Sequence, residues 1–228
     1  AIRPDDDIDA IHSIYVDQWD WEKVISKEER NMETLEYTVN KVYSALKETE
    51  QFMARRYNYI EAYLPDEITF ITSQELETMY PDKTPKEREY RFAKAKGAIF
   101  IKQIGKTLAS GTKHDGRAPD YDDWELNGDI IVYYPVLDIA LELSSMGIRV
   151  DEEALKRQLK AAGCEERAGL DFQKSLLAGE LPYTVGGGIG QSRICMFYLR
   201  KAHIGEVQSS VWPDEIVQHA SENGLYLL

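Results

Sequence analysis

The sequence is poor in cysteine and has no recognisable set of zinc ligands. Cys164 and Cys195 are the only two cysteines among 228 residues. Neither belongs to a CxxC motif, and no histidine pair has metal-ligand spacing. Because a disulfide framework or a structural zinc site needs such patterns, we expect neither of them. This cysteine usage favours a reducing compartment, and we expect a cytoplasmic location.

Long apolar runs and a surplus of basic residues are also missing. The apolar stretch over residues 130–137 is far shorter than the roughly 20 residues that cross a bilayer. The chain has 27 Lys and Arg against 40 Asp and Glu, which gives a formal charge of −13. Such a charge opposes tight binding to a phosphate backbone. We therefore expect neither a membrane nor a nucleic acid as a partner.

The sequence does contain enough apolar material for a hydrophobic core. Hydrophobic residues make up 43% of the chain, and a chain of this length buries roughly 70% of the surface that it exposes when unfolded. We expect residues 1–228 to form one domain without disulfides or a structural metal.

Apolar periodicity predicts strands and helices that come in blocks. Alternation predicts a strand over residues 11–21, with Gln18 and Asp20 on one face. Helical spacing predicts a long helix over residues 31–57, and Thr84-Pro85 opens a helix that ends at Gly97. Further strands are expected over residues 68–71, 98–104, 129–137, 138–150 and 207–211. Further helices are expected over residues 151–162 and 167–177, and a last helix follows residues 186–190 and continues to Arg200. Residues 105–128 resemble a long polar loop. This mixture favours an α+β fold with an antiparallel sheet.

A run of glycines is expected to form a turn before the last of these helices. Gly186, Gly187, Gly188 and Gly190 let the backbone approach a ligand, and Arg193 adds a fixed positive charge one turn later. The pattern is neither a Walker A loop nor a dinucleotide-binding fingerprint. From these residues alone, a nucleotide site and tight packing of the helix are both open interpretations.

Two other groups of charged residues are candidates for phosphate chemistry. Arg3, followed by the acidic turn of residues 5–7, has a guanidinium that suits bidentate hydrogen bonds to a phosphate. Asp129 and Glu142, on successive predicted strands, suit an Mg²⁺ ion that carries phosphate oxygens. For both groups, solvated surface side chains are the alternative.

The order of these pieces resembles the nucleotide site of class II aminoacyl-tRNA synthetases. Residues 3–21 are similar to motif 2, and residues 186–200 are similar to motif 3. Six segments in order resemble the ammonia-dependent asparagine synthetases, or aspartate–ammonia ligases, of the AsnA type: residues 16–22, 117–124, 126–129, 142–150, 186–193 and 203–205. The resemblance implies a class II synthetase-like antiparallel sheet flanked by helices. Members of this family continue N-terminally beyond Arg3, so we expect the segment with motif 1 to be missing from this sequence.

The resemblance also implies a reaction. A ligase of this kind activates the side-chain carboxylate of L-aspartate with ATP, giving a β-aspartyl adenylate and pyrophosphate, and ammonia converts the adenylate to asparagine and AMP. No glutaminase part is visible, so free ammonia is the expected nitrogen donor. The resemblance further implies a homodimer.

Roles for individual residues follow from the same resemblance. Arg3 would hold the α-phosphate, and Arg193 would hold the far phosphates or stack on adenine. Gly186 and Gly188 would let the nucleotide lie against the sheet, while Asp129 and Glu142 would take Mg²⁺. The aspartate would be held by Gln18, Asp20, Arg117, Asp122 and Ser145. Either Asp20 or Asp122 would accept the proton of ammonium, which makes them catalytic candidates beside Arg3 and Arg193.

Two alternatives stay open at this point. One is a catalytic fragment of an aspartyl- or asparaginyl-tRNA synthetase, against which the charge of −13 and the lack of an anticodon-binding module argue. The other is a noncatalytic paralogue that binds AMP or asparagine. The presence together of Arg3, Asp129, Glu142 and Arg193 argues against it, because a pure binder needs no phosphate and metal apparatus.

Overall fold

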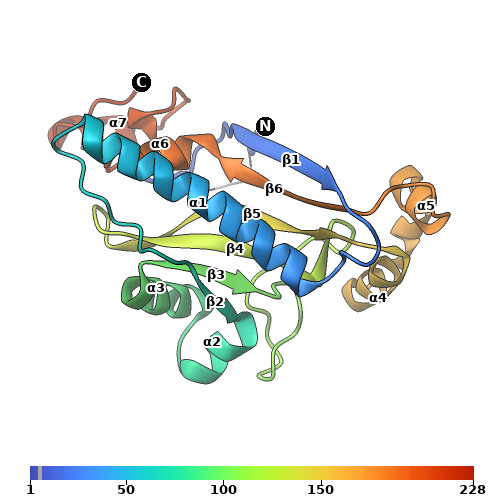
Figure 1. The fold of residues 1–228 in the computed structure, drawn as a ribbon. Helices are drawn as coiled ribbons and strands as arrows, with labels where there is room; N and C mark the ends of the chain where they lie inside the picture. The colour runs from blue at the N-terminus through green and yellow to red at the C-terminus, as the bar shows by residue number, and fades with distance from the viewer. Residues whose placement is uncertain (5–6) are drawn as a thin grey trace.

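A computed structural model describes residues 1–4 and 7–228, so Asp5 and Asp6 of the predicted acidic turn lie outside the described residues. The described residues form a six-stranded sheet in the order β1-β6-β5-β4-β3-β2 (Figure 1). Neighbouring strands are antiparallel except for the β2 and β3 pair. The strands are β1 (Gln18–Val24), β2 (Thr69–Thr72), β3 (Ala98–Lys102), β4 (Asp122–Tyr134), β5 (Ile139–Arg149) and β6 (Thr184–Gly190). The predicted α+β fold with a mainly antiparallel sheet is confirmed.

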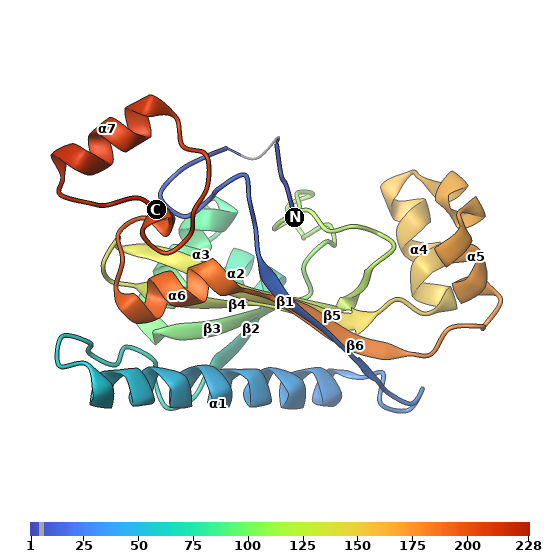
Figure 2. The same cartoon turned by 90° about the horizontal axis from the view of Figure 1, so that it is seen from above.

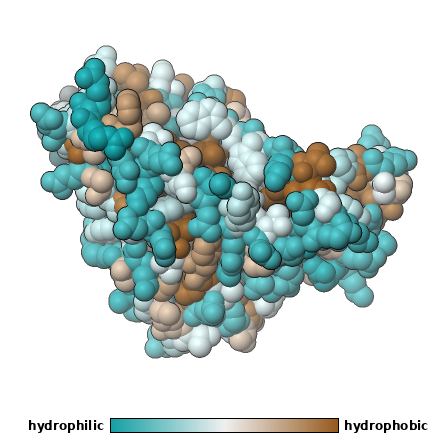
Figure 3. All heavy atoms as spheres, viewed as in Figure 1, coloured by the Kyte–Doolittle hydropathy of each residue, from teal (hydrophilic) through white to brown (hydrophobic). Residues whose placement is uncertain are grey.

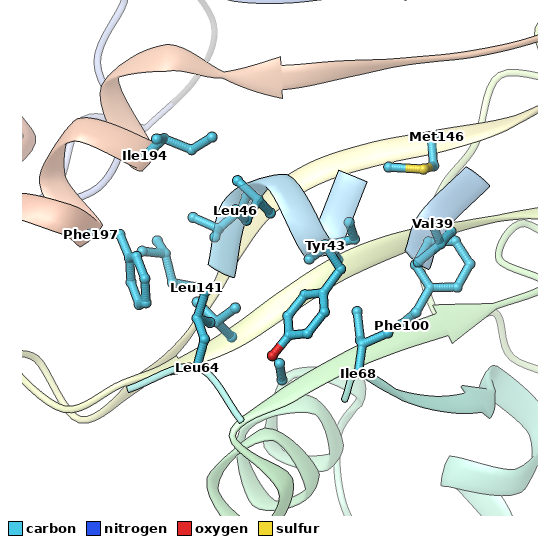
Figure 4. Close-up of a cluster of buried hydrophobic side chains, with 14 of the residues drawn as sticks. Val39, Tyr43, Leu46, Leu64, Ile68, Phe100, Leu141, Met146, Ile194 and Phe197 are labelled. Carbon is cyan, nitrogen blue, oxygen red and sulfur yellow. The ribbon is translucent and has the colours of Figure 1, made fainter. Parts of the chain in front are cut away.

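Helix α1 (Met32–Arg56) runs along one side of the sheet, while α2 (Ser73–Met79), α3 (Pro85–Lys96) and α7 (Asp214–Glu222) lie on the other (Figure 2). Helix α1 begins at Asn31, whose side chain accepts a hydrogen bond from the backbone N–H of Thr34. This confirms the predicted long helix. Its apolar stripe packs on the strands, and Figure 4 shows Tyr43 among Leu64, Ile68 and Phe100. The core between α1 and the sheet therefore uses one face of each central strand. On the outside, hydrophilic side chains cover most of the face seen in Figure 3, between separate hydrophobic patches.

Two helices cover part of the opposite face. Helix α3 (Pro85–Lys96) begins at the predicted Thr84 cap and ends at Gly97, whose φ of +80° suits a residue without a Cβ. Helix α2 (Ser73–Met79) was not predicted, although Thr72 and Glu75 form a capping box at its start. With β2, β3 and β4 they enclose a second cluster of buried side chains: Ile71, Leu76, Phe92, Ala93, Ile99, Ile101, Ile104 and Ile131. The remainder of this face is left for polar residues.

The remaining helices lie at the two ends of the sheet (Figure 2). Helix α4 (Glu152–Ala162) is as predicted, but the predicted helix over residues 167–177 is divided into a 3₁₀ turn (Glu165–Gly169) and α5 (Asp171–Leu177). The break occurs because Leu170 is extended, with φ −79° and ψ 159°. At the other end lie α6 (Gln191–Leu199), a 3₁₀ turn (Ile204–Glu206) and α7 (Asp214–Glu222).

Four other predictions are wrong in part. Residues 11–17 form a loop instead of a strand, because Asp9 accepts the backbone N–H groups of Ile11 and His12 at 2.8 Å and closes a turn. The polar loop ends earlier than predicted, since β4 already begins at Asp122. The glycine run is the strand β6 instead of a turn, because β1 and β5 pair with it on both sides. Residues 207–211 form no strand, and α7, which was not predicted, follows them.

Candidate active site

The sheet face opposite α1 has a sector in which glycines lie beneath polar side chains. Gly190, Gly188 and Gly186 of β6 pair with Gln18, Asp20 and Glu22 of β1, which puts all six residues on one face. A Cβ atom on Gly188 would lie 2.9 Å from Oδ1 of Asp20 and 3.0 Å from Nε2 of Gln18. The missing side chain therefore gives room for Gln18 and Asp20 to lie over β6. As predicted, these two share one face.

A cavity of about 630 Å³ opens over this sector. Six residues that sequence analysis assigned to the site line it: Arg3, Gln18, Glu142, Ser145, Gly188 and Arg193. The other five assigned residues do not line it: Asp20, Arg117, Asp122, Asp129 and Gly186. The structure thus brings residues that are up to 190 positions apart into one cavity, while the rest lie beside or beneath it.

A β-bulge decides which residues of β5 reach the cavity. Ile130 pairs with Ser144 but Ile131 pairs with Glu142, so the register shifts by one residue within β5. Without the shift, Glu142 and Ser145 would point to opposite faces, because they are three residues apart. With it, both line the cavity.

Two carboxylates meet at this bulge. Asp129 on β4 pairs with Ser145 on β5, and it receives a hydrogen bond from Nη2 of Arg117 at Oδ2. Its other oxygen, Oδ1, is buried without a hydrogen-bond partner in the part of the chain that the structure describes. Burial and the nearby charge of Asp129 raise the pKa of Glu142. A cation between these carboxylates would satisfy the unpartnered oxygen and relieve their repulsion.

The donor set fits an ion that brings other ligands with it. Within residues 1–4 and 7–228, no group of three or more His, Cys, Asp or Glu side chains is arranged to hold a metal. Mg²⁺ accepts one or two protein carboxylates when phosphate oxygens and water complete its shell. Asp129 and Glu142 therefore suit a nucleotide-bound Mg²⁺ better than a resident metal.

Arg193 and Arg3 supply positive charge to the cavity from two segments. Arg193 projects from α6, and it donates from Nη1 to the carbonyl oxygen of Glu142 at 3.1 Å and from Nε to that of Ile11 at 3.4 Å. These two bonds fix the plane of its guanidinium. The backbone of Arg3 is held by a hydrogen bond from its N–H to the carbonyl oxygen of Ile14 at 2.7 Å.

Beside the cavity, the buried Arg149 joins the buried Asp122 and the exposed Glu22 in an ion-pair network, of which sequence analysis singled out only Asp122. Arg149 at the end of β5 donates to Glu22, with Nη2 to Oε2 at 2.8 Å, and it also donates to Asp122. Its guanidinium carbon lies 4.0 Å from the ring centre of Tyr121. Burial raises the pKa of Asp122 to about 6, even though Arg149 lowers it. Gly147 and Arg149 are two residues apart on one strand, so both lie on the face of Asp122. This spacing was the sequence signal that could have revealed the network.

None of the helices in the described part of the chain is long and apolar enough to span a membrane.

Comparison with known sequences gives a consistent result. A sequence model of a family described as aspartate-ammonia ligase matches residues 1–224. The chain is 64% identical over 228 residues to the aspartate–ammonia ligase of Clostridium perfringens, and it covers 68% of that protein. It is 62% identical to the enzyme of Ruminiclostridium cellulolyticum and 57% identical to that of Lactobacillus acidophilus, again at 68% of their lengths.

Solved structures agree on the fold. An aspartyl-tRNA synthetase from Entamoeba histolytica is similar with a TM-score of 0.63 at 19% identity, over 91% of this chain and 45% of that one. An asparaginyl-tRNA synthetase of the same organism, in complex with asparaginyl-adenylate, gives 0.62 at 15% identity over 91% and 49%. At these identities the likeness shows the fold alone, and it confirms the predicted class II synthetase-like architecture.

The two sets of similarities separate the alternatives. Identities of 57–64% with ligases, against 19% and 15% with the two synthetases, do not favour a fragment of a tRNA synthetase. The chain therefore belongs to the aspartate–ammonia ligase family and is a ligase.

Proposed function

We propose that the cavity over β6 is where ATP activates the side-chain carboxylate of L-aspartate and where ammonia then displaces AMP to give L-asparagine. The observation that carries this proposal is the meeting of Arg3, Arg193 and Glu142 over Gly188 in one cavity. The resemblance to motifs 2 and 3 implies this meeting. The 64% identity with a curated aspartate–ammonia ligase supports the same reaction.

The charges of the cavity support a nucleotide that brings a cation. Besides His12, the described lining residues include five carboxylates and three Lys or Arg side chains. The carboxylates belong to Asp7, Asp9, Asp17, Asp115 and Glu142, and the basic groups to Arg3, Lys86 and Arg193. A triphosphate would be repelled by this surplus of negative charge without added positive charge. Mg²⁺ held by Asp129 and Glu142 would offset charge on the phosphates.

The phosphates would lie between the two arginines. Arg3 would bind the α-phosphate, where negative charge increases as the aspartate oxygen attacks phosphorus and pyrophosphate leaves. Arg193, whose guanidinium is already fixed by two carbonyl oxygens, would contact the far phosphates or the adenine. A fixed guanidinium loses little conformational entropy when the nucleotide binds. Gly188 would let the nucleotide lie close to the sheet.

The aspartate would lie toward β1 and the end of β5. Gln18 and Ser145 line the cavity there, and Asp20 lies over Gly188. An amino acid needs an acidic group for its ammonium and an arginine for its carboxylate. Asp20 and Asp122 are the acids, and Arg117 is the cation, that sequence analysis assigned to these roles. Arg117 is engaged with Asp129, so binding of aspartate would exchange one carboxylate partner for another.

Ammonium must lose a proton before its nitrogen can attack the adenylate. Asp122 has a pKa raised to about 6 by burial, which is close to the range in which a general base works at neutral pH. Asp20 is exposed and lies over a cavity glycine. Both stay candidates for the proton acceptor.

Assembly, location and organisation are part of the proposal. We propose a homodimer, a cytoplasmic location, a single catalytic domain over residues 1–228 and no role for nucleic acid. The support is the family resemblance and the charge of −13.

The test is an assay of the full-length protein in two steps. Pyrophosphate release should depend on aspartate, ATP and Mg²⁺, and asparagine should form when ammonium is added. Charging of tRNA with aspartate or asparagine would contradict the proposal. Binding of AMP or asparagine without any pyrophosphate release would instead identify a noncatalytic paralogue.

A further inference from the structure

Lys86 brings a third positive charge to the cavity, from an element that sequence analysis did not connect with the site. It lies in the first turn of α3 and lines the cavity together with Glu142, Asp115 and Arg193. Its ammonium interacts electrostatically with the carboxylates of Glu142 and Asp115. Lys86 therefore stands beside the carboxylate to which we assign the nucleotide-bound cation.

A buried carboxylate holds the exposed ammonium of Lys86 in place. Nζ of Lys86 donates to Oε2 of Glu89 at 3.0 Å and lies 3.3 Å from Oε1. Glu89 is buried, and its Oε1 also lies 3.0 Å from Nε2 of the buried His114. An exposed lysine normally moves through many rotamers. Here Glu89, on the same helix, restricts the Lys86 side chain, and His114, in the loop before β4, restricts the Glu89 side chain.

The position of this group favours a phosphate over the aspartate carboxylate as its ligand. Lys86 stands on α3, which packs on β3, β4 and β5. Gln18 and Asp20 of the aspartate end are on β1, two strands beyond β5. An ammonium carries three donors, and the two oxygens of Glu89 use at most two of them. At least one donor is left for an anion beside Glu142.

We propose that Lys86 binds the phosphate chain that leaves as pyrophosphate, and that Glu89, supported by His114, positions it. This inference rests on the proposed function and adds a residue to its phosphate end. Lysine suits this task because it acts as a compact point charge toward phosphate. Loss of one charge-assisted hydrogen bond is expected to weaken phosphate binding about tenfold or more.

The test compares Lys86→Ala, Lys86→Arg and the control Lys83→Ala in the full-length protein. Nζ of Lys83 lies 3.9 Å from Oε1 of Glu87, and Lys83 is not among the described residues that line the cavity. Titration calorimetry with inorganic pyrophosphate and Mg²⁺ should show about tenfold weaker binding for Lys86→Ala, partial recovery for Lys86→Arg and no change for Lys83→Ala. AMP should bind all four proteins equally, because it lacks the leaving phosphates.

Kinetics separate the phosphate from the aspartate as the ligand. Lys86→Ala should raise KM for ATP by a similar factor and leave KM for aspartate unchanged. Unchanged pyrophosphate affinity and unchanged KM for ATP, or a rise in KM for aspartate alone, would overturn the proposal. If the wild-type protein made no asparagine, the proposed function would fail, but the pyrophosphate titration would still decide the role of Lys86.

The role of Glu89 is tested by non-additivity. Glu89→Gln should weaken pyrophosphate binding in the wild type and should have no further effect in Lys86→Ala, because it acts through the lysine. Equal effects of Glu89→Gln in both backgrounds would overturn the positioning role. Thermal unfolding of each variant checks that the comparison is made on folded protein.

Discussion

Arg149 reaches across β6 to hydrogen-bond Glu22, and Gly186 is the residue that makes room for this contact. Arg149 is on β5 and Glu22 is on β1, with β6 between them. A Cβ atom on Gly186 would lie 2.6 Å from Nη2 of Arg149 and 2.4 Å from Oε2 of Glu22. The pair therefore lies directly over the glycine, and it ties the outermost strand to the middle of the sheet.

Removing the Arg149 side chain should destabilise the fold. Arg149→Met leaves the buried Asp122 without its cation, and breaking a buried pair in this way costs about 3 kcal/mol in the free energy of unfolding. Urea denaturation measures the loss. The control is Arg157→Ala, whose exposed guanidinium contacts Asp123 at 3.0 Å and should contribute less than about 1 kcal/mol. Equal losses for the two variants would contradict the role of the network.

Asp122 should make stability depend on pH in an unusual direction. Its pKa is raised from 3.8 to about 6 by burial, so the folded protein binds this proton more tightly than the unfolded chain does. The contribution of Asp122 to stability is greatest below pH 4, falls as the pH rises from about 4 to 6 and is constant above that. Unfolding of wild type and Asp122→Asn between pH 4 and 7 measures the difference. If the difference in the free energy of unfolding between the two proteins does not change across this pH range, the raised pKa is refuted.

Replacing the proton acceptor should affect the ammonia step more than the activation step. If Asp20 or Asp122 accepts the proton, asparagine formation by its Asn variant should fall about 10²-fold or more beyond any fall in aspartate-dependent pyrophosphate release, which reports the role of the same residue in holding aspartate. The two products are measured in the same reaction with and without ammonium. If both Asp20→Asn and Asp122→Asn keep ammonia-dependent asparagine formation, neither residue has this role.

Two adjacent glycines should respond differently to the same substitution. In Gly188→Ala the new Cβ meets the side chains of Asp20 and Gln18, which can move, so substrate binding should weaken with a stability loss under about 1 kcal/mol. In Gly187→Ala the Cβ lies 2.5 Å from Cβ of Met146 and 2.6 Å from the carbonyl oxygen of Ser145. Because these atoms belong to the packed core and to the backbone and cannot move aside, the free energy of unfolding should fall by about 2 kcal/mol. Thermal unfolding and KM values together distinguish the two cases, and the reverse pattern would contradict the assigned faces of β6.

Local signals in the sequence were sufficient where they specify an element by itself. Asn31 and the apolar spacing after it predicted α1, and Thr84, Pro85 and Gly97 predicted both ends of α3. The same local logic failed for residues 11–17, where side-chain bonds of Asp9 close a turn in spite of strand-like alternation.

The order of motifs along the chain was enough to predict the fold class and the family, and both are confirmed. The same resemblance assigned Arg3, Glu142 and Arg193 to the nucleotide and its cation, and the structure places these three residues in one cavity. Fold class and family depend on sequence order and residue type, so predicting them needs no knowledge of strand register.

The strand register and the long-range contacts were decided by the tertiary structure. The glycine run became a strand because β1 and β5 pair with it, and the bulge in β5 turned Glu142 and Ser145 to the same face. Arg149 and Glu22 are 127 positions apart, and Lys86 meets Glu142 only because α3 packs against β5. No local pattern encodes such contacts, since a shift of one residue in the pairing of two strands reverses which side chains reach the site.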